Sequence, residues 1–80
     1  MSIMKKVMTL NEIIGEKLRE LRKEKELSQD DIAKEIKIDR STIAKYETGA
    51  AVPSVYILVA LANFYGVSAD YILGLKEFPS

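Results

Sequence analysis

Hydrophobic residues along this chain recur every three or four positions, and polar residues fill the positions between them. Leu10, Ile14, Leu18 and Leu21 form one such row, which is the pattern of a helix that buries one face. Turn-forming and capping residues divide the chain into five segments. No segment alternates hydrophobic and polar residues as a half-buried strand would. The pattern predicts an all-α fold of five short helices, at residues 10 to about 25, 29–36, 40 to about 48, 55–65 and 69–73.

Capping residues mark where several of these helices begin. Thr9 and Glu12 have the spacing of a capping box, in which each side chain bonds the backbone N–H of the other residue. Ser28, Asp39 and Ser68 have the side chains preferred at the N-cap position. We therefore expect them to cap the second, third and fifth helices.

A chain of 80 residues is long enough for one domain. We expect that domain to cover residues 9–75, with tails at 1–8 and 76–80. The longest run of hydrophobic residues extends from Val55 to Ala62, which is far shorter than the roughly 20 residues that cross a bilayer. No signal peptide is recognisable near the N-terminus. The expected location is the cytoplasm, without a membrane partner.

The chain contains no cysteine and no histidine. These absences remove the commonest metal ligands and the side chain most often used as a general base near neutral pH. The remaining acidic, basic and hydroxyl side chains lie on polar helix faces and form no catalytic motif. We therefore expect no enzymatic activity, no metal and no cofactor.

Charge is balanced overall but unevenly distributed. Twelve Lys and Arg residues match twelve Asp and Glu residues, so no general basic field favours nucleic acid. Between Lys17 and Tyr46 there are nine basic and seven acidic residues, whereas Lys76 is the only basic residue from Gly49 onward. Any contact with DNA must therefore be local.

The second and third helices, joined by a turn of three residues at 37–39, have the arrangement of a helix-turn-helix. In that motif the second of the two helices enters the major groove of DNA. Here it would present one face of small and basic side chains, with Ile43 and Tyr46 directed inward. Small residues permit close approach to DNA, and basic ones reach bases and phosphates. The residues of this face are Arg40, Ser41, Ala44, Lys45 and Thr48.

The ordered series of residues in this region resembles the XRE family, the helix-turn-helix group of phage repressors and Cro. The resemblance covers about Glu12 to Leu75 and implies a fold like that of the lambda repressor. It is carried by Leu21-Arg22, Leu27-Ser28-Gln29, Ile32-Ala33, Ile38-Asp39-Arg40-Ser41-Thr42-Ile43, Tyr46-Glu47-Thr48-Gly49, Pro53-Ser54, Leu61-Ala62 and Gly66-Val67-Ser68.

The resemblance also implies roles for individual residues. Gln29, after the cap residue Ser28, matches a residue that binds a DNA phosphate and supports the recognition helix. Arg22 and Glu47 match an ion pair that ties the first helix to the end of the third. The remaining DNA-contacting positions implied are Arg40, Ser41, Thr42, Lys45 and Thr48. For the DNA-contacting residues, the alternative interpretation is an ordinary solvated helix surface, whereas the pair of Arg22 and Glu47 is structural under either interpretation.

Two features depart from the family pattern. Lys37 stands in the turn where the family usually has glycine, because the backbone there adopts a positive φ; a side chain costs roughly 1 kcal/mol. Residues 50–52, Ala-Ala-Val, replace basic residues that often contact the DNA backbone. This loss lowers the affinity for DNA and its salt dependence, so we expect moderate affinity or help from dimerisation.

The resulting hypothesis is a transcriptional regulator that binds double-stranded DNA, as a homodimer on a two-fold symmetric operator. The fourth helix is hydrophobic around its whole circumference, so part of it is expected to be exposed and to form an interface. The candidate interface residues are Tyr56, Ile57, Tyr71 and Leu75. The alternative hypothesis is a protein-interaction module, such as an antitoxin-like protein that covers a protein partner with the same fold.

Overall fold

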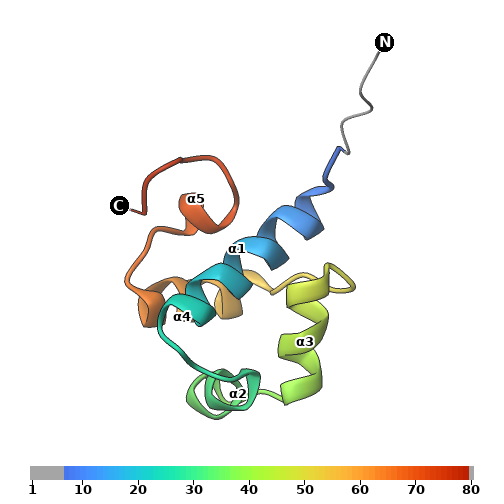
Figure 1. Cartoon of the computed structure of the whole chain (residues 1–80), viewed down its shortest axis with the longest axis vertical. Coiled ribbons are helices and arrows are strands. Elements are labelled where there is room, and N and C mark those ends of the chain that lie inside the picture. The colour runs from blue at the N-terminus through green and yellow to red at the C-terminus, as the bar shows by residue number, and fades with distance from the viewer. Residues whose placement is uncertain (1–6, 80) are drawn as a thin grey trace.

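The computed structural model describes residues 7–79, so most of the expected N-terminal tail lies outside the described residues. The described residues form five α-helices and no strand, which confirms the predicted all-α fold (Figure 1). The helices are α1 (Leu10–Glu24), α2 (Gln29–Ile36), α3 (Arg40–Thr48), α4 (Val55–Tyr65) and α5 (Ala69–Ile72). None of them is long and apolar enough to cross a membrane.

One hydrophobic core joins the five helices. In Figure 1, α1 crosses the middle of the molecule, with α2 and α3 on one side and α5 on the other. Contacts between helices connect α1 with α3 and α5, α2 with α3 and α4, and α4 with α5. The buried hydrophobic residues come from all of these helices: Ile14, Leu18, Leu21, Ile32, Ala33, Ile43, Tyr46, Leu61, Ala62, Tyr65 and Ile72.

Capping hydrogen bonds set most of the helix starts. Thr9 and Glu12 form the expected capping box, with N···O distances of 2.9 and 3.1 Å. Ser28 forms a second box with Asp31, at 2.8 and 3.0 Å; the N–H of Ser28 bonds the Asp31 carboxylate and lowers its pKa. The expectation for Asp39 is only partly met. Its backbone occupies the N-cap position of α3, but its side chain makes no capping hydrogen bond.

Two other expectations need correction. Leu10, placed in the inward row of α1, is 56% exposed because it is the first residue of a helix whose N-terminal end extends past its neighbours (Figure 1). The fifth helix ends at Ile72 and not at Leu73, which is its C-cap. Beyond it, the carbonyl of Pro79 accepts a 2.7 Å hydrogen bond from the N–H of Ser68. The last described residues therefore return to the start of α5.

Gly15 allows α1 and α3 to lie very close together. A Cβ atom added at this position would come within 2.4 Å of the carbonyl oxygen of Tyr46 and within 2.7 Å of that of Glu47. No side chain fits there without a shift of the α3 backbone. The orientation of α3 thus depends on the absence of a side chain in the middle of α1.

Lys37 adopts the left-handed conformation expected from its place in the turn, with φ 66° and ψ 47°. The turn is held by the N–H groups of Lys37 and Ile38, which both donate to the carbonyl of Ala33. Glycine reaches this conformation without the steric cost that a Cβ atom brings. The turn is therefore formed at the expense of some stability.

The substitution Lys37→Gly is expected to raise the free energy of unfolding by about 1 kcal/mol. For a domain of this size the melting temperature should then rise by about 4–8 °C, as followed by circular dichroism. Lys34→Gly, inside α2, is the control and should instead lower stability by about 0.5–1 kcal/mol. A fall in melting temperature for Lys37→Gly would show that its side chain stabilises the turn in another way.

Candidate nucleic-acid interface

The third helix separates its side chains into an inward and an outward face. Ile43 and Tyr46 are buried in the core, which fixes the rotation of α3 about its axis. The outward side chains of Arg40, Ser41, Lys45 and Thr48 are exposed, and Thr42 and Ala44 are half-buried. The face predicted from the sequence is therefore present at the surface.

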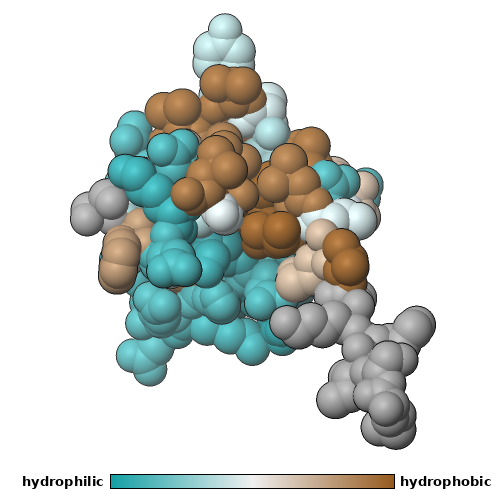
Figure 2. Space-filling model, turned by 90° about the horizontal axis from the view of Figure 1, so that it is seen from above, coloured by the Kyte–Doolittle hydropathy of each residue, from teal (hydrophilic) through white to brown (hydrophobic). Residues whose placement is uncertain are grey.

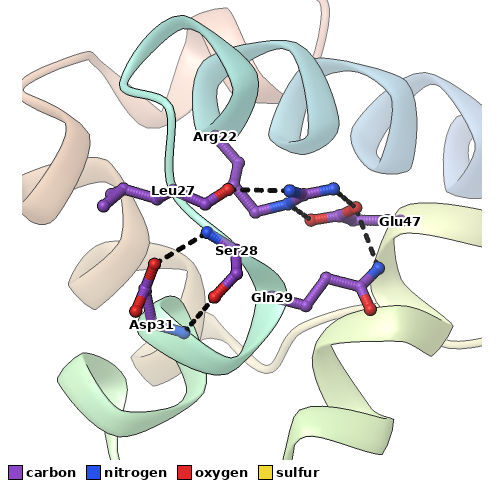
Figure 3. A network of polar contacts seen from close by, with 6 residues as sticks. All are labelled: Arg22, Leu27, Ser28, Gln29, Asp31 and Glu47. Carbon is purple, nitrogen blue, oxygen red and sulfur yellow. Dashed lines mark hydrogen bonds and ion pairs between the residues drawn. The ribbon is translucent and has the colours of Figure 1, made fainter.

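An ion pair between Arg22 of α1 and Glu47 of α3 lies behind this face (Figure 3). Arg22 donates from Nε to Glu47 Oε2 at 2.7 Å and from a terminal nitrogen to Oε1 at 2.9 Å. Its other terminal nitrogen donates to the carbonyl of Leu27 at 2.8 Å. The side chains are only 13% and 5% exposed. The hydrogen bond to Glu47 raises the pKa of Arg22, so the guanidinium stays charged.

Gln29, the first residue of α2, joins the same network. Its Nε2 donates to Glu47 Oε1 at 3.2 Å, so the start of α2 is tied to the end of α3 (Figure 3). An amide nitrogen has two N–H groups, and one of them is left for a ligand outside the protein. Beside it, the Ser28 hydroxyl caps α2 by accepting from the N–H of Asp31. The network holds α1, α2 and α3 together at the edge of the outward face.

Tyr65 is buried near this network. Burial raises the pKa of Tyr65 to about 12, and the negative charge of Glu47 adds to the rise while Arg22 opposes it. The folded state thus favours the neutral phenol. An unfolded chain has no such preference and its tyrosine ionises near pH 10.

We expect the protein to lose stability between pH 10 and about 12, because in this range Tyr65 ionises in the unfolded chain but not in the folded one. The folded-state pKa lies above the unfolded one. The contribution of the neutral phenol to the free energy of unfolding is therefore complete below pH 10, and it is lost as the pH rises through the folded-state pKa. Thermal melts of the wild type and of Tyr65→Phe across this range measure it. The melting temperature of the wild type should fall more steeply than that of the variant; parallel curves would contradict the assignment.

At the end of α3, several polar groups already have hydrogen-bond partners within the chain. The hydroxyl of Thr48 donates to the carbonyl of Lys45 at 3.2 Å, so it can accept a hydrogen bond from a ligand but not donate one. The N–H groups of Gly49 and Ala51 already bond carbonyls of α3. The N–H of Ala50, between them, donates to neither of these carbonyls.

The candidate interface residues of the second half of the chain fall into two groups. Tyr56 and Leu75 are 87% and 73% exposed. Ile57 and Tyr71 are instead half-buried and pack against the core, and the ammonium of Lys17 lies 4.7 Å from the centre of the Tyr71 ring. Ile57 and Tyr71 therefore have less surface available for an interface than Tyr56 and Leu75.

The exposed hydrophobic residues of α4 are Val55 and Val59 together with Tyr56. Their spacing places them on one side of the helix. Figure 2 shows hydrophobic residues gathered over the upper half of that view, whereas hydrophilic residues cover the lower half. The molecule therefore has a polar face and a separate surface rich in hydrophobic residues.

Comparison with known proteins agrees with this architecture. The helix-turn-helix model HTH_3 matches residues 18–72. The chain is 42% identical over 64 residues to the uncharacterized HTH-type transcriptional regulator YobD of Bacillus subtilis (strain 168), covering 80% of this chain and 57% of YobD. It is 36% identical over 55 residues to the cryptic phage CTXphi transcriptional repressor RstR of Vibrio cholerae, covering 69% of this chain and 50% of RstR.

A solved structure has the same arrangement of helices. The restriction-modification controller protein C.AhdI from Aeromonas hydrophila superposes with a TM-score of 0.72 at 31% identity, covering 78% of this chain and 94% of that one. The chain spans about half the length of the two curated relatives. The similarity therefore concerns the helix-turn-helix region.

Proposed function

The chain belongs to the helix-turn-helix family HTH_3, and we propose that it regulates transcription by binding operator DNA through α3. The observation that carries this proposal is the outward face of α3, where small and basic side chains lie exposed while the ion pair of Arg22 and Glu47 holds the helix from behind. Inserted into the major groove, such a face brings donors to base edges without obstruction from bulky side chains.

Separate residues would read bases and hold the DNA backbone. Arg40, in the first turn of α3, has a fork of donors that suits the two acceptors of guanine. Lys45 is a flexible cation suited to a phosphate. Gln29 can donate its second N–H to a phosphate while the first remains bonded to Glu47. The remaining residues proposed to lie against DNA are Ser28, Ser41, Thr42 and Thr48.

Binding to a two-fold symmetric operator would require two copies of the chain. The exposed residues of α4, Val55, Tyr56 and Val59, support this because one copy leaves them in water and a two-fold dimer is the commonest assembly. Dimerisation would also offset the missing basic residues at 50–52, since each half-site then adds to the affinity. We propose that Tyr56 and Leu75 contribute directly to this interface.

Selection from a random pool of DNA duplexes tests the DNA-binding function. The purified chain is expected to enrich one sequence, repeated as an inverted half-site, and to bind it more tightly than a scrambled duplex of the same composition. The affinity for both should fall as salt is added, because bound cations of the DNA are released. If no sequence is enriched and no duplex is bound, the proposal is wrong.

Replacing Tyr56 with glutamate should abolish self-association. The charge would be placed in the proposed apolar interface, and the 87% exposure of Tyr56 means that the monomer fold should not be affected. Sedimentation at high concentration should show a dimer for the wild type and a monomer for Tyr56→Glu, with weaker binding to the two-site duplex. Arg19→Glu, at an exposed position of α1, is the control. A wild type that remains monomeric would contradict the proposed interface.

The same exposed hydrophobic surface supports a second candidate, a protein-interaction module. In that function the surface would be covered by a different protein, and the outward face of α3 would not be needed. The selection experiment separates the two functions. A partner module should retain a bound protein on purification and should enrich no DNA sequence.

A further inference from the structure

Ala44 is the one outward residue of α3 whose side chain carries no polar group. It lies one turn after Arg40 and one turn before Thr48, and Ser41 and Lys45 are its neighbours on the same outward face. It is half-buried and therefore still reachable from the groove side, although its methyl group cannot form a hydrogen bond. A ligand group that packs against the Ala44 methyl must be apolar. A polar group there would lose its hydrogen-bond partners, which costs binding free energy.

We propose that Ala44 reads a thymine by contact with its C5-methyl group. The inference rests on the proposed function, since it assumes that α3 enters the major groove. On the major-groove edges of the four base pairs, the thymine methyl is the only apolar group. An alanine methyl extends little from the helix, so the base edge and the helix backbone can approach closely. A thymine therefore fits this position better than any other base.

Thr48, the outward residue one turn after Ala44, does not offer a competing donor. The Thr48 hydroxyl has given its only hydrogen to the carbonyl of Lys45 at 3.2 Å, so it cannot donate to a purine acceptor. Arg40 and Lys45 are exposed and have side chains much longer than that of Ala44, so they can contact other bases or phosphates. Ala44 lies about 6 Å along the helix axis from Arg40, so the thymine should be within about two base pairs of the base that Arg40 reads.

Uracil substitution tests this inference because uracil differs from thymine only by the missing methyl group. The duplex enriched by the wild type from the random pool is prepared with each thymine replaced by uracil in turn. At one thymine in each half-site, the wild type should lose about three- to five-fold in affinity, the size expected for one buried methyl group. At the other thymines the change should be negligible.

Two variants show whether Ala44 is responsible. Ala44→Ser, whose helix content is checked by circular dichroism, should bind the thymine and uracil duplexes equally well. Ala60→Ser, a control that makes the same change at a half-buried alanine of α4, should show the wild-type loss on uracil. Ala44→Gly provides a second test without a new polar group and should likewise lose the discrimination.

The outcomes distinguish this inference from the function on which it rests. If a sequence is enriched but no uracil substitution matters, or if Ala44→Ser and Ala44→Gly keep the wild-type uracil loss, the role of Ala44 is wrong while DNA binding stands. If no sequence is enriched at all, the proposed function fails and the role of Ala44 fails with it.

Discussion

Replacing Arg22 with alanine is expected to lower the free energy of unfolding by about 3–5 kcal/mol, the range for a buried ion pair that loses one partner. Three donors of Arg22 are used, two by Glu47 and one by the carbonyl of Leu27. Removal of the side chain leaves the Glu47 carboxylate, 5% exposed, with only the amide of Gln29 as a partner. An almost buried charge with so little compensation destabilises the folded state strongly.

Thermal unfolding measures this effect. With about 4–8 °C of melting temperature for each kcal/mol in a domain of this size, Arg22→Ala should melt at least about 12 °C below the wild type. Lys34→Ala is the matched control, because Lys34 pairs with Asp30 at 3.3 Å on an exposed surface. That loss should be below about 1 kcal/mol. Equal melting temperatures for the two variants would show that the Arg22 pair contributes no more than a surface pair.

The helix boundaries were predictable because local chemistry sets most of them. Thr9 and Ser28 cap α1 and α2 through side-chain hydrogen bonds, and Gly66 ends α4 in the left-handed conformation. These interactions involve residues three or four positions apart, so they can be read from the sequence. Asp39 shows the limit of such reasoning, since its side chain has the right type and position but makes no capping bond.

Features that depend on how the helices cross were not predictable in the same way. Gly15 lies inside a segment whose pattern predicts an ordinary amphipathic helix. Only the position of α3 shows that a Cβ atom at Gly15 would collide with backbone carbonyls of α3. A lone glycine inside a helix was the available signal, because it is tolerated there chiefly where the backbone is closely approached. Likewise, Ile57 packs inward while Val55 and Tyr56 do not, which depends on the rotation of α4 against the core.

The candidate site was predictable in its residues and in one of its connections, the ion pair of Arg22 and Glu47 that the family resemblance implied. The positions on the outward face of α3 follow from helical spacing alone. The hydrogen bond from Gln29 to Glu47 joins α2 to α3, and that from Arg22 to the carbonyl of Leu27 joins α1 to the loop before α2; helical spacing indicates neither bond. Sequence reasoning therefore identified the face and the ion pair behind it, whereas the structure adds the hydrogen bonds that complete the network.

Arg40→Ala and Lys45→Ala are expected to weaken DNA binding in different ways. Arg40 is the first residue of α3 and is exposed. In a helix-turn-helix, the first residues of the recognition helix contact base edges. The loss of Arg40 should cost roughly 1–3 kcal/mol on the enriched duplex and relax the choice of base at one position in each half-site. Lys45, one turn later, should contact a phosphate, so its loss should weaken all duplexes about equally and reduce the salt slope by about one for each lost contact.

Titration of both variants against the enriched and the scrambled duplex, at two salt concentrations, distinguishes base recognition from binding to the DNA backbone. For Arg40→Ala the loss should be large on the enriched duplex and small on the scrambled one, because a guanine contact exists only in the correct sequence. For Lys45→Ala the two losses should match, and they should shrink as salt is added. Equal losses of Arg40→Ala on both duplexes would mean that Arg40 contacts only the backbone. If neither variant changes binding to any duplex, α3 does not read DNA, and the exposed hydrophobic surface of α4 becomes the remaining candidate for the function of the chain.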